Sequence, residues 1–104
     1  METVNTIAKA LALGALALQW APTHESINRL YLDIKHRLDE KFPSISLVNL
    51  QDSPQSRGIQ FLLKEDLANV VAGDDGLLVH KCHALINAVT EHNPELLEKL
   101  ALPE

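Results

Sequence analysis

The chain has 104 residues, of which 46% are hydrophobic and 22% are charged, and its formal net charge at pH 7 is −5. This length predicts one domain spanning residues 1–104, and the composition excludes disordered, collagen-like and low-complexity proteins. The single cysteine excludes a disulfide framework and any zinc site built from several cysteines. The acidic balance, with basic residues mixed among acidic ones, argues against a nucleic-acid-binding surface.

Residues 2–19 predict a first helix that is apolar on most of its faces, with the run ALALGALAL at residues 10–18. Such a helix lies at the centre of a fold or contacts a partner. Gly14 costs a helix about 1 kcal/mol relative to alanine. Its presence therefore predicts the close approach of another helix, over a small-residue groove formed with Ala10. Trp20 ends this helix next to Pro22, where it could be an exposed anchor, but we expect it to be buried against the following helix.

Residues 23–41 predict a second, amphipathic helix with Thr23 as its N-cap and Phe42-Pro43 after its end. Its apolar residues recur at i, i+3, i+4, i+7 and i+11, which is the pattern of one buried helical face. These residues are Ile27, Leu30, Tyr31, Ile34 and Leu38. The charged residues occupy the other faces.

Residues 44–51 alternate between apolar and polar side chains. Because a single strand would have no partner in this chain, we interpret them as one or two helical turns. Ser53 followed by Pro54 predicts the start of a fourth helix. Its apolar stripe leads to Gly73, which we expect just after the helix end. The stripe comprises Ile59, Leu62, Leu63, Leu67, Val70 and Val71.

A fifth helix is predicted after Asp74 or Asp75, either of which can serve as its N-cap, and it ends near His92. Asn93-Pro94 then opens a short last helix. The connections are short, so neighbouring helices should be antiparallel. The predicted fold is all-α, a compact antiparallel bundle of five to six helices.

The residues predict no catalytic group, no cofactor site and no metal site. His80 and His83 share a helix face at i, i+3 and could share a metal, but Cys82 lies on the apolar stripe. It therefore points inward, away from at least one of the two histidines. The acidic pairs lie at helix ends or on polar faces rather than in a cleft with shifted pKa values. No phosphate-binding glycine loop and no nucleophile elbow is present. We expect a protein that is not an enzyme.

The apolar run at residues 10–18 is shorter than the about 20 residues that span a membrane. The N-terminus lacks the basic segment of a secretory signal. We therefore expect a cytoplasmic protein, which the unpaired cysteine also favours.

Several pieces of the chain, in their order, resemble a class of small helical domains in bacterial proteins. The pieces are ALALGALAL, INRLYLDIKHRL, SLVNL, SPQSRGIQFLLKEDLANV and GDDGLLVHKCHALINAV, and they cover about residues 7–90. The chain resembles the effector-associated and death-like helical adaptors of bacterial immunity and signalling systems. The resemblance implies a bundle of five or six helices, with a death-like arrangement among those it allows. It also implies a protein–protein role, in which like helical domains associate and recruit an effector.

The expected partner is another helical adaptor domain or a second copy of this chain, joined through complementary strips of charge. The basic strip comprises Arg29, Lys35, Arg37 and Lys41. The acidic strip comprises Glu65, Asp66, Asp74 and Asp75. Complementary strips steer orientation more than they add affinity. We expect the assembly to weaken as the salt concentration rises.

The sequence also allows two alternative functions. One is a membrane-active protein that uses its apolar first helix, although that helix is too short to span a bilayer and the negative net charge disfavours anionic lipid. The other is a helical bundle that holds a small ligand in an internal apolar cavity.

Overall fold

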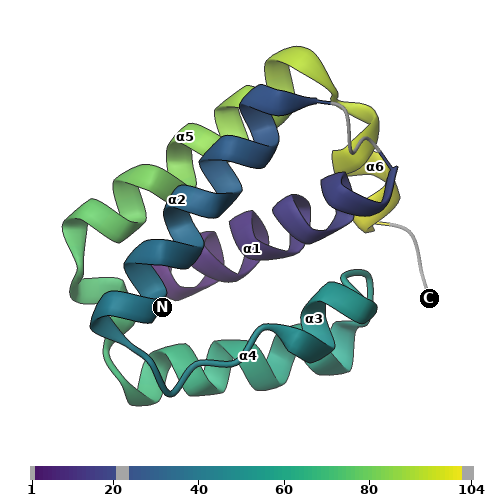
Figure 1. Ribbon diagram of the computed structural model, residues 1–104. Helices are drawn as coiled ribbons and strands as arrows, with labels where there is room; N and C mark the ends of the chain where they lie inside the picture. The colour runs from purple at the N-terminus through teal and green to yellow at the C-terminus, as the bar shows by residue number, and fades with distance from the viewer. Residues whose placement is uncertain (1, 21–23, 102–104) are drawn as a thin grey trace.

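The chain folds into packed helices, and the computed structural model describes residues 2–20 and 24–101 (Figure 1). The described elements are, in order, α1 (Glu2–Trp20), α2 (Glu25–Lys41), α3 (Val48–Asp52), α4 (Arg57–Asn69), the short 3-10 helix η1 (Ala72–Asp74), α5 (Gly76–His92) and α6 (Glu95–Ala101). No strand occurs within the described ranges. The predicted all-α fold class is confirmed.

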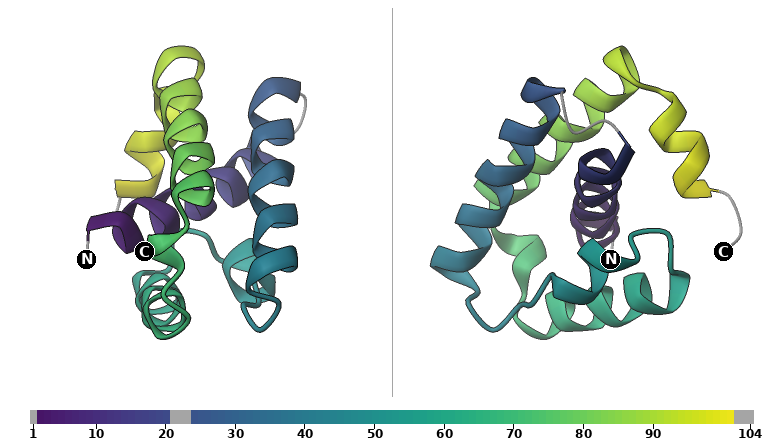
Figure 2. Two further views of the ribbon diagram at one scale, coloured as in Figure 1. Left: turned by 90° about the vertical axis from the view of Figure 1, so that its left-hand side faces the viewer. Right: turned by 45° about the vertical axis from the view of Figure 1, so that its right-hand side comes forward.

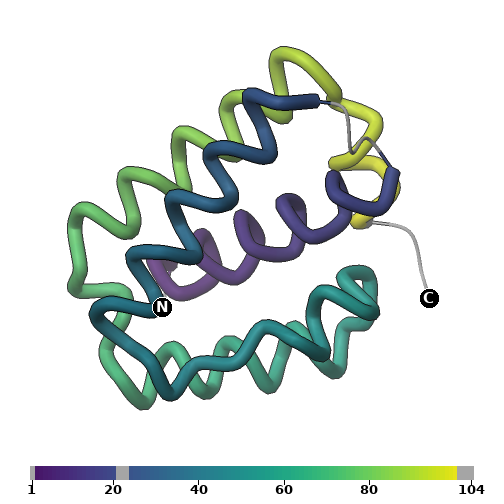
Figure 3. The backbone as a smooth tube through the Cα atoms, in the orientation of Figure 1, coloured from purple at the N-terminus to yellow at the C-terminus, as the bar shows by residue number. Residues whose placement is uncertain are grey.

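The first helix, α1, lies at the centre of the fold. It packs against α2, α3, α4, α5, α6 and η1, and the right-hand view of Figure 2 shows these elements arranged around it. On one side of α1, α2 and α5 lie side by side and run in opposite directions (Figure 3). On the other side, α3 and α4 pack together. The apolar first helix is therefore the centre of this fold, which is the first of the two interpretations its sequence allowed.

Small side chains make this central position possible. Every residue from Ala10 to Ala17 is buried, and this stretch of eight contains four alanines and one glycine. A Cβ atom on Gly14 would lie 2.6 Å from Cγ and 3.0 Å from Cβ of Tyr31. The close approach predicted at Gly14 is therefore confirmed, and the approaching group is the Tyr31 ring of α2.

Tyr31 and Gln51 take part in hydrogen bonds that link α1, α2 and α3. The Tyr31 ring is buried, and its hydroxyl accepts a hydrogen bond from Nε2 of Gln51 in α3 (3.1 Å). Gln19 of α1 in turn donates from Nε2 to the backbone carbonyl of Gln51 (2.9 Å). Burial raises the pKa of the Tyr31 hydroxyl, and the hydrogen bond from Gln51 opposes that rise. Burial therefore favours the neutral form of the Tyr31 hydroxyl.

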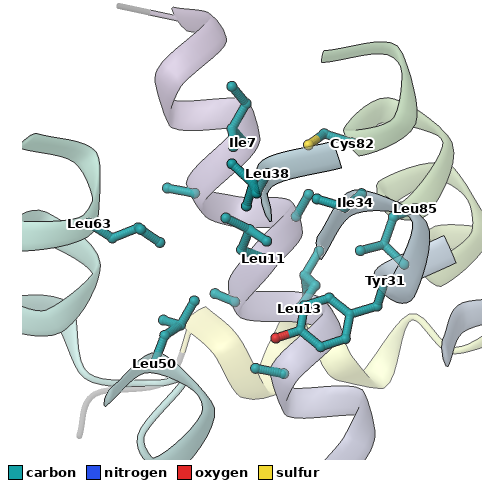
Figure 4. Close-up of a cluster of buried hydrophobic side chains, with 14 of the residues drawn as sticks. Ile7, Leu11, Leu13, Tyr31, Ile34, Leu38, Leu50, Leu63, Cys82 and Leu85 are labelled. Carbon is teal, nitrogen blue, oxygen red and sulfur yellow. The ribbon is translucent and has the colours of Figure 1, made fainter. Parts of the chain in front are cut away.

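The hydrophobic core surrounds α1 on both sides (Figure 4). The side chains labelled there are Ile7, Leu11 and Leu13 of α1, Tyr31, Ile34 and Leu38 of α2, Leu50 of α3, Leu63 of α4, and Cys82 and Leu85 of α5. Each fully buried large apolar side chain stabilises the fold by about 1.5–3 kcal/mol. Cys82 points inward, as its place on the apolar stripe predicts, and burial raises the pKa of its thiol to about 12.

The N-caps of α4 and α5 show what short-range signals can predict. Asp75 caps α5, because its Oδ1 accepts a hydrogen bond from the backbone N–H of Leu78 (3.1 Å), as predicted. The predicted cap of α4 is wrong by three residues: Ser56, not Ser53, accepts from the backbone N–H of Ile59 (3.3 Å). The carbonyl of Ser53 instead accepts from the N–H of Ser56 (3.1 Å), so the serine-proline pair forms a turn that leads into the helix.

The ends of α1 and α2 also differ from expectation. Trp20 is 58% exposed, so its predicted burial is wrong. It is the last residue of α1, beyond the buried stretch, and its ring lies 4.1 Å from Nζ of Lys99 in a cation–π contact. The N-cap of α2 is His24, without a side-chain hydrogen bond. The predicted cap, Thr23, lies outside the described residues.

The end of α4 places a β-branched residue in the left-handed conformation. The helix ends at Asn69, Val70 is its C-cap, and Val71 follows with φ 58° and ψ 38°. The expectation that Gly73 takes this position is wrong, because Gly73 lies in η1 without a positive φ. Its role is close approach instead, since a Cβ on Gly73 would lie 3.3 Å from Cβ of Thr3.

Replacing Val71 with glycine is expected to stabilise the protein by up to about 1 kcal/mol. The left-handed conformation costs a side-chain-bearing residue about 1–2 kcal/mol, and glycine adopts it freely. The greater freedom of glycine in the unfolded chain and the lost contacts of Val71, which is 55% exposed, offset part of this gain. The free energy of unfolding in urea measures the change. The matched control is Val70→Gly, where φ is an ordinary −96° and the substitution should destabilise. A loss of stability in Val71→Gly would contradict the assignment of strain to Val71.

Candidate functional site

An ion pair joins one residue of the predicted basic strip to one of the predicted acidic strip within the same chain. Nε and Nη2 of Arg37 in α2 donate to Oδ2 and Oδ1 of Asp75 before α5, at 3.0 and 3.1 Å. The two side chains are 22% and 10% exposed. The hydrogen bonds from Arg37 lower the pKa of Asp75 below its ordinary value; partial burial opposes this, and the backbone N–H of Leu78 reinforces it.

This pairing gives both residues a contact within their own chain, whereas their role as contacts for a second chain stays a prediction. The antiparallel arrangement of α2 and α5 brings the C-terminal half of α2 beside the N-terminus of α5. Arg37 and Asp75 therefore hold two helices of one chain together, and their charges already satisfy each other.

The rest of the predicted basic strip lies on α2, where acidic side chains interrupt it. Arg29 lines the same shallow depression as Glu25 and Asp33. Lys35 is half-buried, and its Nζ lies 5.5 Å from the centre of the Tyr31 ring. Lys41 is exposed at the end of the helix. The basic residues thus form separate positive positions rather than one continuous strip.

The rest of the predicted acidic strip lies on two elements. Glu65 and Asp66 are exposed on the outer face of α4, and Asp74 is exposed in η1. All three remain on the surface.

Two large apolar side chains stand next to each other on the outer face of α4. Phe61 is 60% exposed and Leu62 is 59% exposed, whereas Leu63 and Leu67 of the same helix face α1 and are buried. The expectation that Leu62 belongs to the buried stripe is wrong. A phenylalanine that falls outside the stripe is the sequence signal that could have identified this face.

A cleft of about 590 Å³ lies between α1, α4 and α6. Three cationic side chains line it: Lys9 of α1 and Arg57 and Lys64 of α4. The amides Asn5 and Gln60 also line it. No sequence motif marks this site, although the spacing of seven residues between Arg57 and Lys64 places them on one face of a helix.

The apolar part of the same cleft comes from α1 and α6. Ala8 is buried, and Leu97 and Leu100 are half-buried. The cleft therefore combines positive charge with an apolar surface, which is the composition of a site that fixes a ligand by one polar end.

The histidines beside Cys82 are exposed, while the thiol is buried. Within the ranges that the structure describes, no group of three or more metal-ligating side chains comes together. A thiol whose pKa is raised to about 12 is a poor nucleophile at neutral pH.

Comparisons with protein-family models, with curated proteins and with solved structures give no match. Among the described helices, none combines the length and the apolar character that crossing a bilayer requires.

Proposed function

We propose that the chain is a non-enzymatic protein-interaction module of the cytoplasm, acting as an adaptor in bacterial signalling or defence. It associates with a second copy of itself or with a related helical domain, and so recruits an effector protein. The resemblance described above supports this role. The structural observation that carries it is the exposed pair Phe61 and Leu62 on the outer face of α4.

The exposed pair is suited to association because it adds nothing to the core of its own chain. Burying a leucine or phenylalanine side chain is worth about 1.5–3 kcal/mol. Aromatic side chains at the centre of an interface often carry a large share of the binding energy. Together, Phe61 and Leu62 form a small apolar patch on the surface of α4.

The charges around the pair indicate which surface it contacts. Glu65 and Asp66 follow Phe61 and Leu62 by one helical turn, so acidic residues border the apolar pair. On α2, Leu32 is exposed, and its neighbours one turn away include basic residues. These basic neighbours are Arg29 and Lys35. On this surface of mixed charge, Arg29 and Lys35 can face Glu65 and Asp66 of another copy, so the outer face of α4 fits the surface around Leu32 through these separate positive positions.

This contact joins two different surfaces. An association of this kind is head-to-tail, and it produces rings or filaments rather than a two-fold dimer. It also keeps the basic-against-acidic arrangement predicted from the sequence, with Arg37 and Asp75 removed from it.

The expected result is that the mass of the protein grows reversibly with concentration and falls as salt is added. Light scattering after size-exclusion chromatography measures both. Phe61→Ser combined with Leu62→Ser should leave a monomer at every concentration, and Leu32→Ser should do the same. The matched control is Leu77→Ser, which removes an exposed leucine of α5 and should assemble like the original chain.

Two outcomes would contradict this proposal. A wild-type chain that stays monomeric at all concentrations would refute association with itself. A Phe61→Ser, Leu62→Ser variant that assembles like wild type would show that α4 is not the contact. Arg29→Glu should weaken assembly, and adding Glu65→Arg should restore it if these two charges meet across the contact.

The membrane-active alternative fits the structure less well. Its apolar surface would have to come from α1, which is buried from Ala10 to Ala17 and contacts every other helix. Releasing α1 to a bilayer would dismantle the core.

A further inference from the structure

We propose that the cleft between α1, α4 and α6 binds a small organic anion that carries an apolar chain, such as a medium-chain carboxylate. This inference is independent of the proposed association through α4 and Leu32. It gives a binding role to the cationic side chains of the cleft, and the proposed association does not use these side chains.

The cleft follows from the way the helices pack. Both α4 and α6 pack against α1, but within the described residues they do not pack against each other. The right-hand view of Figure 2 shows them on neighbouring sides of α1. Gln55, which precedes α4, donates from Nε2 to the carbonyl of Lys99 in α6 (2.7 Å). This hydrogen bond ties the two walls together, so the space between them is a built feature of the fold.

The described lining of the cleft is positively charged, although the net charge of the whole protein is negative. The chain has 14 acidic and 9 basic residues, excluding histidine. Three of those nine basic residues line the cleft, and among the described residues no carboxylate lines it. Positive side chains gathered on a low-dielectric wall concentrate anions from solution. Lys9 and Lys64 come from different helices, so they approach a bound anion from two walls.

The lining also selects for an apolar group next to the anion. Leu97 and Leu100 lie one turn apart on α6, and Ala8 lines the wall formed by α1. Gln60 donates from Nε2 to the carbonyl of Pro54 (2.6 Å), which holds its side chain in place on the α4 wall. A volume of about 590 Å³ accommodates an alkyl chain of medium length together with its headgroup.

The direct test is titration of the 15N-labelled full chain with octanoate, followed by amide chemical shifts. We expect saturable shifts that are concentrated around Lys9, Lys64 and Leu97. Acetate has the headgroup without the chain, and 1-octanol has the chain without the charge; each should bind at least tenfold more weakly than octanoate. Added salt should weaken the binding of octanoate.

Charge reversal separates the cleft from general electrostatic attraction. Lys9→Glu with Lys64→Glu should weaken octanoate binding at least tenfold. Lys41→Glu with Lys81→Glu makes the same change in net charge away from the cleft and should leave the affinity unchanged. If the first variant does not fold, Lys9→Gln with Lys64→Gln makes the same test with a smaller expected loss.

Three results would overturn the proposal. The first is octanoate that gives no saturable shifts, or shifts spread over the whole chain. The second is 1-octanol that binds as well as octanoate, which would make the cleft merely apolar. The third is equal weakening by both pairs of lysine reversals. None of these results changes the mass measurements that test association, so the two proposals fail separately.

Discussion

Replacing Gly14 with alanine is expected to destabilise the fold by about 2 kcal/mol, although alanine is the better helix former. The added methyl group would lie well inside contact distance of the Tyr31 ring, with Cγ at 2.6 Å. Tyr31 is buried and held by Gln51, so α1 and α2 must separate or the ring must move. Overpacking of this kind costs about 1–3 kcal/mol or more, and the gain in helix propensity offsets about 1 kcal/mol of it.

The same substitution at Gly58 is the matched control for Gly14→Ala. Gly58 lies in α4 with its nearest neighbouring atom, Oγ of Ser56, at 4.0 Å, so Gly58→Ala should be neutral or stabilising by up to about 1 kcal/mol. A double-mutant cycle makes the test sharper. In a Tyr31→Ala background, Gly14→Ala should become stabilising, because the obstructing ring is gone. Unfolding in urea measures all four chains, and a neutral Gly14→Ala in the original background would refute the packing described here.

Replacing Asp75 with alanine is expected to lower the free energy of unfolding by about 2–4 kcal/mol at pH 7. The substitution removes the N-cap of α5, which is worth about 1 kcal/mol. It also leaves the partly buried guanidinium of Arg37 without its carboxylate, which costs about 1–3 kcal/mol. Asp75→Asn retains a cap to Leu78 and loses only the ion pair, so it should cost less.

The difference in unfolding free energy between the original chain and Asp75→Asn should depend on pH, because the pKa of Asp75 is lowered in the folded chain. The pKa of its carboxyl is lower in the folded chain than in the unfolded chain, chiefly because Arg37 donates hydrogen bonds to it. Its stabilising contribution is therefore complete above the unfolded pKa of about 4. It is lost as the pH falls through the folded pKa. The gap in stability between the original chain and Asp75→Asn should shrink between pH 7 and pH 2. A gap that stays constant over this range would show that the ion pair does not stabilise the fold.

Local signals predicted much of the fold, because they depend on residues close together in sequence. The apolar periodicity of α2 placed Tyr31 on its buried face, and Asp75 was identified as a candidate cap of α5. The glycine within α1 predicted a close contact at Gly14. Two adjacent signals were harder to separate: Ser53 and Ser56 are both good N-caps, and only the turn between α3 and α4 decides for Ser56.

Features that depend on tertiary packing were not accessible from the sequence. The left-handed Val71 contradicts the local preference of valine, and the surrounding turn imposes it. The ion pair of Arg37 and Asp75 joins residues 38 positions apart, so charge patterning alone assigned them to an external contact. The cationic cleft combines residues of α1 with residues of α4 and α6 and appears only when these helices surround it.

Amide spectra of the 15N-labelled protein over a dilution series show whether α4 of one chain contacts α2 of another. If this contact forms, signals around Phe61, Leu62 and Leu32 shift together as the protein is concentrated, while those of α5 stay fixed. These shifts become smaller when salt is added. Spectra that do not change with concentration, or changes confined to other faces, would contradict this contact.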